Sequence, residues 1–168
     1  GAEMCIRDSY STYEMFERKE GRNHPSLSRT LTSASLVADA VARGISGFDL
    51  ETAYEAMVKN ATQVGDDDGN YGRRGIAAFA TLGWVPHDEV EHAAARTQDF
   101  AYNDFCVAQV ARALGREGEY RRYRERAFYY RNTFNRKTGF MQGRLRDGSW
   151  ETPFDEFGWG GAYIEGSA

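Results

Sequence analysis

The sequence predicts a mainly α protein in which paired antiparallel helices are followed by a long irregular loop. Three observations carry this prediction. Apolar residues recur at the 3.6-residue period of a helix over several stretches. Glycines stand directly after these stretches, where helices commonly end. From residue 138 onward the period is lost and glycine and aromatic residues become frequent, which indicates a loop.

The first helical pair is expected between residues 33 and 61. Residues 33–43 are rich in alanine and end before Gly44, a residue type that favours the left-handed position after a helix. Asp49 then offers an N-cap for a second helix. Apolar side chains recur along that helix at spacings of three and four residues, at Leu50, Ala53, Tyr54, Met57, Val58 and Ala61.

An acidic stretch at residues 65–72 separates the two helical pairs. It contains Asp66, Asp67, Asp68 and Asn70 and could be mistaken for a calcium-binding loop. An EF-hand requires ligands at alternate positions and a glutamate at the twelfth, which this stretch lacks. We therefore interpret it as a solvated loop.

The second helical pair is expected between residues 91 and 132. After a short helical stretch at 75–81, the sequence Gly83-Trp84-Val85-Pro86 predicts a rigid turn, because proline disfavours a helical conformation of the preceding residue. The longest helix is predicted over 91–114, ending before Gly115, and another from Gly118 through Asn132. The predicted apolar stripe of the long helix comprises Phe100, Ala101, Phe105, Ala108, Ala111 and Leu114.

The remaining residues are predicted to lack helix. Glycines and the dipeptide Asp147-Gly148 indicate a β-hairpin or irregular loop that ends at Trp150. Residues 154–166 show no period. Successive helix pairs occur in solenoids and in closed toroids, and the absence of a repeat of about 34 residues disfavours a solenoid. Loops at one rim of such folds carry the functional residues, so residues 154–166 are the predicted place of a binding or catalytic site.

Composition excludes several functions. The formal net charge is −4 and the pI is about 5.5, so the chain has no basic field that would attract nucleic acid or anionic lipid. No run approaches the roughly 20 apolar residues of a membrane span. The two cysteines do not suggest a disulfide framework or a metal site. Residues 4–9 resemble the translation of a sequencing adaptor, so we interpret residues 1–9 as a possible artefact and expect the first and last residues to mark the limits of a sequence fragment.

Residues 154–166 combine groups that a glycosidase needs. Asp155, Glu156 and Glu165 stand among aromatic residues and glycines. A carboxylic acid can protonate a leaving oxygen, an aromatic face can hold a sugar, and glycine lets the backbone approach it. From these residue types alone a structural loop is the favoured interpretation, with Glu165 as an ordinary cap or salt-bridge partner.

A series of short motifs occurs along about residues 31–168. In order, they include Val37-Ala38-Asp39-Ala40, Arg43-Gly44-Ile45, Ala53-Tyr54-Glu55-Ala56, Gly83-Trp84-Val85-Pro86, Phe100-Ala101-Tyr102-Asn103-Asp104-Phe105, Tyr130-Arg131-Asn132, Thr138-Gly139-Phe140-Met141, Phe154-Asp155 and Glu165-Gly166-Ser167-Ala168. In order and spacing they resemble the catalytic domain of the family 92 glycoside hydrolases, which are calcium-dependent inverting exo-α-mannosidases. The chain departs from the family pattern at Thr32-Ser33-Ala34 and at Glu156, where the family usually has proline.

The resemblance implies a fold and a division of the chain. Residues 31–168 would be a fragment of an (α/α)6 toroid, the six-hairpin fold, with residues 154–168 as an irregular rim loop. Residues 1–30 match the family poorly. In the family a β-sandwich domain precedes the toroid, so this domain and the remainder of the toroid are expected outside this chain. The resemblance also implies a secreted, periplasmic or cell-surface protein.

The resemblance further implies an activity and its residues. Glu165 occupies the place of the family's general acid, which protonates the glycosidic oxygen. Trp159 and Tyr163 flank it and are expected to contact the sugar. The catalytic base and the calcium ligands would lie beyond Ala168, so no metal ligand is assigned within the chain. The expected substrate is a mannose-containing glycan, and the isolated fragment is expected to be inactive.

Two other readings remain open at this point. A helical-repeat interaction module with a structural aromatic loop would share the same pattern of helices. A six-hairpin glycosidase that acts on another sugar would also use a glutamate at the rim as its acid.

Overall fold

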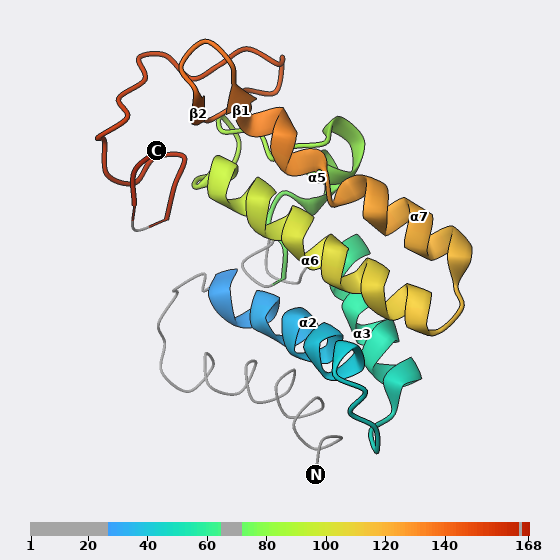
Figure 1. Ribbon diagram of the computed structural model, residues 1–168. Coiled ribbons are helices and arrows are strands. Elements are labelled where there is room, and N and C mark those ends of the chain that lie inside the picture. Colours follow the sequence, from blue (N-terminus) through green and yellow to red (C-terminus); the bar gives the residue numbers. More distant parts are fainter. Residues whose placement is uncertain (1–26, 65–71, 165) are drawn as a thin grey trace.

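The computed structural model describes residues 27–64, 72–164 and 166–168. The predicted acidic loop, most of the N-terminal segment and Glu165 lie outside these residues. Five helices are described, and Figure 1 shows how they are arranged. They are α2 (Leu27–Ala42), α3 (Leu50–Thr62), α5 (Ile76–Leu82), α6 (Ala93–Ala113) and α7 (Glu117–Arg126). A 3₁₀-helix, η1 (Tyr129–Thr133), leads into a short antiparallel hairpin of β1 (Phe134–Asn135) and β2 (Phe140–Met141).

Helix α6 is the centre of the fold. It packs against α7, α2 and α3, and Figure 1 shows α2, α6 and α7 side by side. Because α6 has neighbours on several sides, its buried residues do not follow one stripe. Phe105, predicted on the buried stripe, is 47% exposed, whereas Cys106, Val107 and Val110 are buried. The predicted stripe is therefore wrong at Phe105.

The predicted helix ends are confirmed at several points. Asp49 caps α3, because its Oδ1 accepts a hydrogen bond from the backbone N–H of Thr52 at 3.1 Å. Gly44 and Gly115 follow α2 and α6 with positive φ angles of 68° and 70°, the conformation that glycine adopts without strain. Helix α2 begins at Leu27, earlier than the predicted residue 33.

Helix α7 ends at Arg126, and the prediction of one helix through Asn132 is wrong. The chain tightens into η1 because its side chains meet α5. The ring of Tyr129 lies 5.4 Å from that of Phe79, and Asn132 Nδ2 donates to the backbone oxygen of Gly83 at 2.9 Å. Tertiary packing has overridden the local preference for helix.

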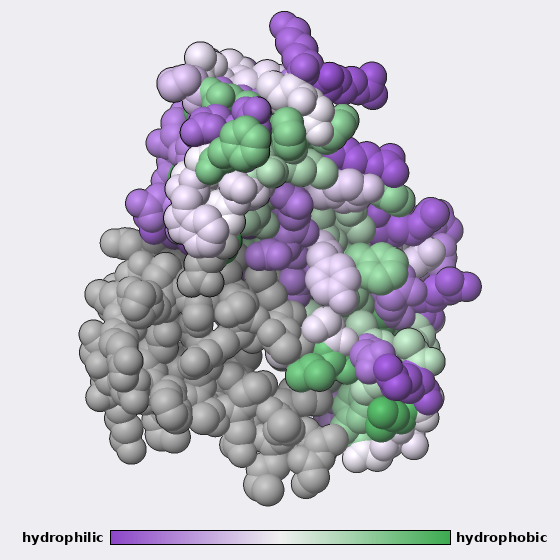
Figure 2. All heavy atoms as spheres, turned by 60° about the vertical axis from the view of Figure 1, so that its left-hand side comes forward, coloured by the Kyte–Doolittle hydropathy of each residue, from purple (hydrophilic) through white to green (hydrophobic). Residues whose placement is uncertain are grey.

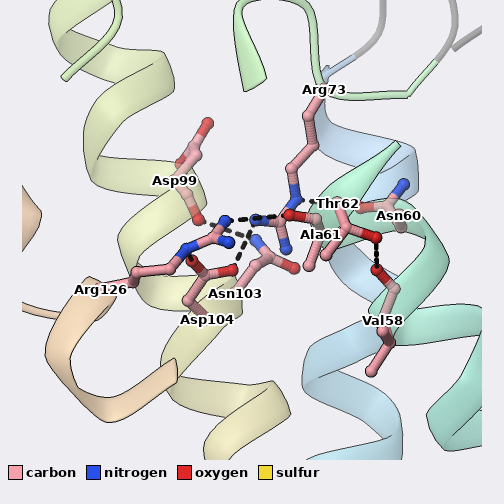
Figure 3. Close-up of polar contacts among 9 residues, drawn as sticks. All are labelled: Val58, Asn60, Ala61, Thr62, Arg73, Asp99, Asn103, Asp104 and Arg126. Atoms are coloured by element: carbon pink, nitrogen blue, oxygen red, sulfur yellow. Dashed lines mark hydrogen bonds and ion pairs between the residues drawn. The ribbon is translucent and has the colours of Figure 1, made fainter. Parts of the chain in front are cut away.

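A buried ionic cluster joins these elements (Figure 3). Asp104 of α6 lies between two arginines: its Oδ1 accepts from Arg73 Nη1, and its Oδ2 pairs with Arg126 Nε, both at 2.6 Å. Arg73 also donates to Asn60 of α3 at 3.0 Å, and Arg126 to the backbone oxygen of Ala61 at 2.9 Å. The cluster thus ties α3, α6, α7 and the segment before α5 together.

One face of the α6–α7 hairpin carries an apolar groove. Its volume is about 540 Å³, and exposed aromatic residues such as Tyr102, Phe105 and Phe128 line it. Another face, shown in Figure 2, has hydrophobic side chains exposed among hydrophilic ones in its upper part, where the hairpin and the C-terminal loop lie. Phe134, Phe140 and Phe157 are exposed phenylalanines of these segments.

Candidate active site

Three irregular segments meet at the N-terminal end of α6: residues 83–92 before it, residues 142–151 after the hairpin, and the C-terminal loop, residues 154–168. The backbone N–H of His87 donates to the oxygen of Arg144 at 2.8 Å, which joins the first two segments. The first N–H groups of a helix have no partner within the helix. These free donors of α6 hold the third segment.

The C-terminal loop is fixed to α6 by its backbone. Gly161 and Ala162 offer carbonyl oxygens to the N–H groups of His92 and Ala95, at 3.0 and 3.1 Å. His92 has a positive φ of 58°, and its Nδ1 lies 2.5 Å from the oxygen of Tyr163. Because a carbonyl can only accept, this contact places the proton on Nδ1.

The end of the loop also folds back on itself. The N–H of Gly160 donates to the oxygen of Gly166 at 2.9 Å. Ala162, between these glycines, is buried. Residues 160–163 and 166 therefore have fixed positions around the α6 N-terminus, on either side of Glu165 along the chain.

His87 and Glu151 form a second contact between the segments. His87 Nε2 lies 3.1 Å from Glu151 Oε1, with both side chains partly buried. The two meet over Gly143, where a Cβ would lie 2.7 Å from Glu151 Oε2 and 3.0 Å from the His87 ring. A larger residue at 143 would thus push them apart.

Arg144, in residues 142–151, contacts the rings of two tryptophans. Its guanidinium carbon is 4.2 Å from the ring centre of Trp84 and 5.3 Å from that of Trp150. It also donates to the backbone oxygens of Gly148 and Asn132. These contacts tie residues 142–151 to Trp84 of the first segment and to Asn132 of η1.

The predicted sugar-contacting residues differ in exposure. Trp159 is 76% exposed, so its ring is accessible. Tyr163 is partly buried, and its hydroxyl has no hydrogen-bond partner in the part of the chain that the structure describes. Burial, and secondarily the charge of Glu151, raises the pKa of Tyr163 to about 12. Its backbone oxygen is bound to His92, so Tyr163 anchors the loop.

The other carboxylates of the loop have local surroundings. Asp155 is exposed and accepts a hydrogen bond from the N–H of Phe157 at 3.0 Å, which stabilises a turn. Glu156 is partly buried. Glu165, the predicted acid, lies outside the described residues, so its role remains a prediction.

His87, His92 and Glu151 were not among the predicted site residues. The only sequence signal for Glu151 is the pair of glycines at positions 143 and 148, which indicate a turn. Backbone pairing across that turn brings Glu151 beside Gly143. Within residues 27–64, 72–164 and 166–168, no three His, Cys, Asp or Glu side chains are grouped so as to hold a metal ion. The expected calcium ligands were placed outside this chain, so this finding does not test them. No described helix is long and apolar enough to cross a membrane.

Comparison with known proteins identifies the family. The model of the glycosyl hydrolase family 92 catalytic domain matches residues 10–168. This chain belongs to glycosyl hydrolase family 92. The family match confirms the predicted fold class, a mainly α portion of the helical catalytic domain. It also disfavours the alternative interpretation as a helical-repeat interaction module.

Solved family 92 structures share the fold. One is an inverting mannosidase from Bacteroides thetaiotaomicron, 37% identical, with a TM-score of 0.76 over 80% of this chain and 18% of its own. Another is an α-mannosidase from the same bacterium, 34% identical, with a TM-score of 0.71 over 80% of this chain and 17% of its own.

A curated relative is an uncharacterized secreted glycosidase from the fungus Arthroderma benhamiae. It is 29% identical over an alignment of 153 positions, which covers 76% of this chain and 20% of the relative. The chain therefore spans about a fifth of the length of the family 92 proteins it matches.

Proposed function

We propose that this chain is part of the catalytic domain of a secreted, inverting, calcium-dependent exo-α-mannosidase that removes terminal mannose from glycans. The observation that carries the proposal is the likeness to an inverting mannosidase at 37% identity over 80% of the chain. The remainder of the toroid and a β-sandwich domain would complete the protein. The secreted relative supports the proposed location.

The proposed acid is Glu165. The loop that precedes it is held at the α6 N-terminus through Gly161, Ala162 and Tyr163. Inverting hydrolysis needs an acid that protonates the leaving oxygen, and a base that activates water on the opposite face of the sugar, roughly 6.5–9.5 Å away. The base and the calcium ligands would come from residues outside this chain. Calcium would help to bind and distort the mannose ring.

The proposed acid is tested by Glu165→Gln in the full-length enzyme. The amide keeps the shape of the side chain and removes the proton, so kcat on a mannobiose should fall by about 10²–10⁴-fold. An aryl α-mannoside with a good leaving group needs little protonation and should lose much less. Glu156→Gln, on the same loop, is the matched control and should leave kcat near that of the parent. Unchanged turnover of mannobiose by Glu165→Gln, with a loss in Glu156→Gln or Asp155→Asn, would reassign the acid.

Two companion measurements test the remaining parts of the proposal. NMR of the first product formed should show β-mannose from an α-linked substrate if the enzyme inverts. Chelation should abolish activity and added calcium should restore it. Turnover of another α-glycoside in preference to mannosides would favour the alternative of a six-hairpin glycosidase with a different sugar.

A further inference from the structure

Glu151 stands where the three segments of the candidate site meet. Its Oε1 lies 3.1 Å from His87 of the first segment. The backbone N–H of Glu151 donates to the oxygen of Gly143 at 2.9 Å, and its backbone oxygen accepts from Gln142 Nε2 at 2.7 Å. Two contacts of its backbone within residues 142–151 thus hold Glu151 in place. A Cβ added at Gly161 of the C-terminal loop would lie 3.9 Å from Oε1. One carboxylate therefore borders all three segments.

Two groups beside this contact are buried. Burial, and secondarily the charge of Glu151, raises the pKa of Tyr163. Both the Tyr163 hydroxyl and His87 Nδ1 are buried and have no hydrogen-bond partner among the described residues. The side chains of His87 and Glu151 are 19% and 28% exposed, so their contact is partly shielded from water, and partial burial strengthens it relative to a fully exposed pair.

We propose that His87 and Glu151 form a positioning pair that holds residues 161–163 of the C-terminal loop at the α6 N-terminus during hydrolysis. The proposal rests on Glu165 being the general acid. His87 donates from Nε2 to the carboxylate, and the carboxylate is held beside Gly161 and Tyr163. Neither residue is assigned a contact with the substrate.

The physical reason is the sensitivity of proton transfer to distance. A general acid must lie within hydrogen-bond reach of the leaving oxygen. A displacement of about 1 Å can lower the rate by about 100-fold. Loosening the loop should therefore slow substrates that need the proton and spare those that do not. A purely structural role would lower both rates alike, through loss of folded enzyme.

The test uses the full-length enzyme and two substrates, a mannobiose and 2,4-dinitrophenyl α-mannoside. Glu151→Gln and His87→Ala should each lower kcat on mannobiose by at least about 10-fold and change kcat on the activated substrate little. His87→Gln keeps a donor in the place of Nε2 and should restore most of the mannobiose rate. The double variant should lose no more than the worse single variant, because the two side chains act as one unit.

The chain offers a matched control. Arg146 of the second segment, residues 142–151, pairs with Glu89 of the first segment at 2.8 Å, in an exposed position. Glu89→Gln removes a link between the same two segments without touching the C-terminal loop, so it should leave both rates unchanged. The thermal midpoint of each variant shows whether it is folded. If Glu151→Gln does not fold, the comparison of His87→Ala with His87→Gln carries the test.

The outcomes separate the two proposals. Equal losses on both substrates, or no loss on either, would overturn the positioning pair when Glu165→Gln shows the expected dependence on leaving group. If Glu165→Gln shows no such dependence, the assignment of the acid fails and the positioning role fails with it. A loss confined to mannobiose in His87→Ala and Glu151→Gln supports the pair.

Discussion

The carboxylate of Asp104 is surrounded by more positive than negative charge. It is fully buried between Arg73 and Arg126, whose side chains are 1% and 5% exposed. Aromatic rings stabilise the two guanidinium groups through cation–π contacts. The guanidinium carbon of Arg73 lies 5.4 Å from the ring centre of Phe100, and that of Arg126 lies 5.4 Å from those of Phe79 and Tyr123. Burial lowers the pKa of Arg73, and the charge of Asp104 opposes this. Asp104 is thus the residue on which the cluster depends.

We predict that Asp104→Asn destabilises the full-length protein by about 3–5 kcal/mol, because breaking a buried ion pair leaves a buried charge without compensation. Denaturant unfolding followed by the fluorescence of the catalytic domain measures the change. The control is Glu117→Gln, which breaks the exposed pair with Arg121 on α7 and should cost less than about 1 kcal/mol. A similar small loss in Asp104→Asn would mean that water reaches the cluster.

At the scale of helices and loops, the sequence is informative where a local rule sets the structure. Asp49 and the glycines after α2 and α6 act within a few residues, so the ends they define could be predicted. The end of α7 and the exposure of Phe105 could not, because each depends on which distant elements pack nearby. In both cases the elements that pack around a helix decide where it ends or which of its side chains are buried. Apolar periodicity in the sequence does not show which elements these are.

The candidate site divides in the same way. Trp159, Tyr163 and Glu165 could be proposed because their residue types and the family motif stand together in the sequence. His87 and Glu151 are 64 positions apart, as the hydrogen bond between them records, and no local pattern joins them. They meet because residues 142–151 turn back on themselves and because Gly143 has no side chain that would separate them. A local motif can therefore suggest the reacting group, whereas its support must be found in the structure.

We predict that Asp49→Ala destabilises the full-length protein by about 1 kcal/mol, the usual loss when an N-cap is removed. Asp49 accepts from both the backbone and the hydroxyl of Thr52, and these bonds lower the pKa of its carboxyl. The control is Asp39→Ala, which removes an exposed pair with Arg43 late in α2 and leaves the helix start intact. Thermal unfolding should place Asp39→Ala close to the parent. Equal losses in the two variants would show that capping is not the cause.

On the scale of the whole molecule, the described helices expose an apolar face. The groove on the α6–α7 hairpin is lined by Tyr102, Phe105 and Phe128, which are 57%, 47% and 44% exposed. Contiguous apolar surface of this kind is uncommon on a monomeric soluble protein and promotes association. The matched family 92 structures are about six times as long as the aligned part, and we propose that further helices of the toroid cover this face.

We therefore predict that the purified 168-residue chain, by itself, neither hydrolyses an aryl α-mannoside nor stays monomeric. It would lack the catalytic base and the calcium ligands that the proposed mechanism places elsewhere, and its exposed groove would associate with other copies. Light scattering and binding of a hydrophobic dye measure the second effect, and Phe105→Ser with Phe128→Ser should reduce both signals. Asp39→Ser, on the exposed surface, should reduce neither. Clear turnover by the purified chain would contradict the prediction, because all groups needed for hydrolysis would then have to lie within these residues.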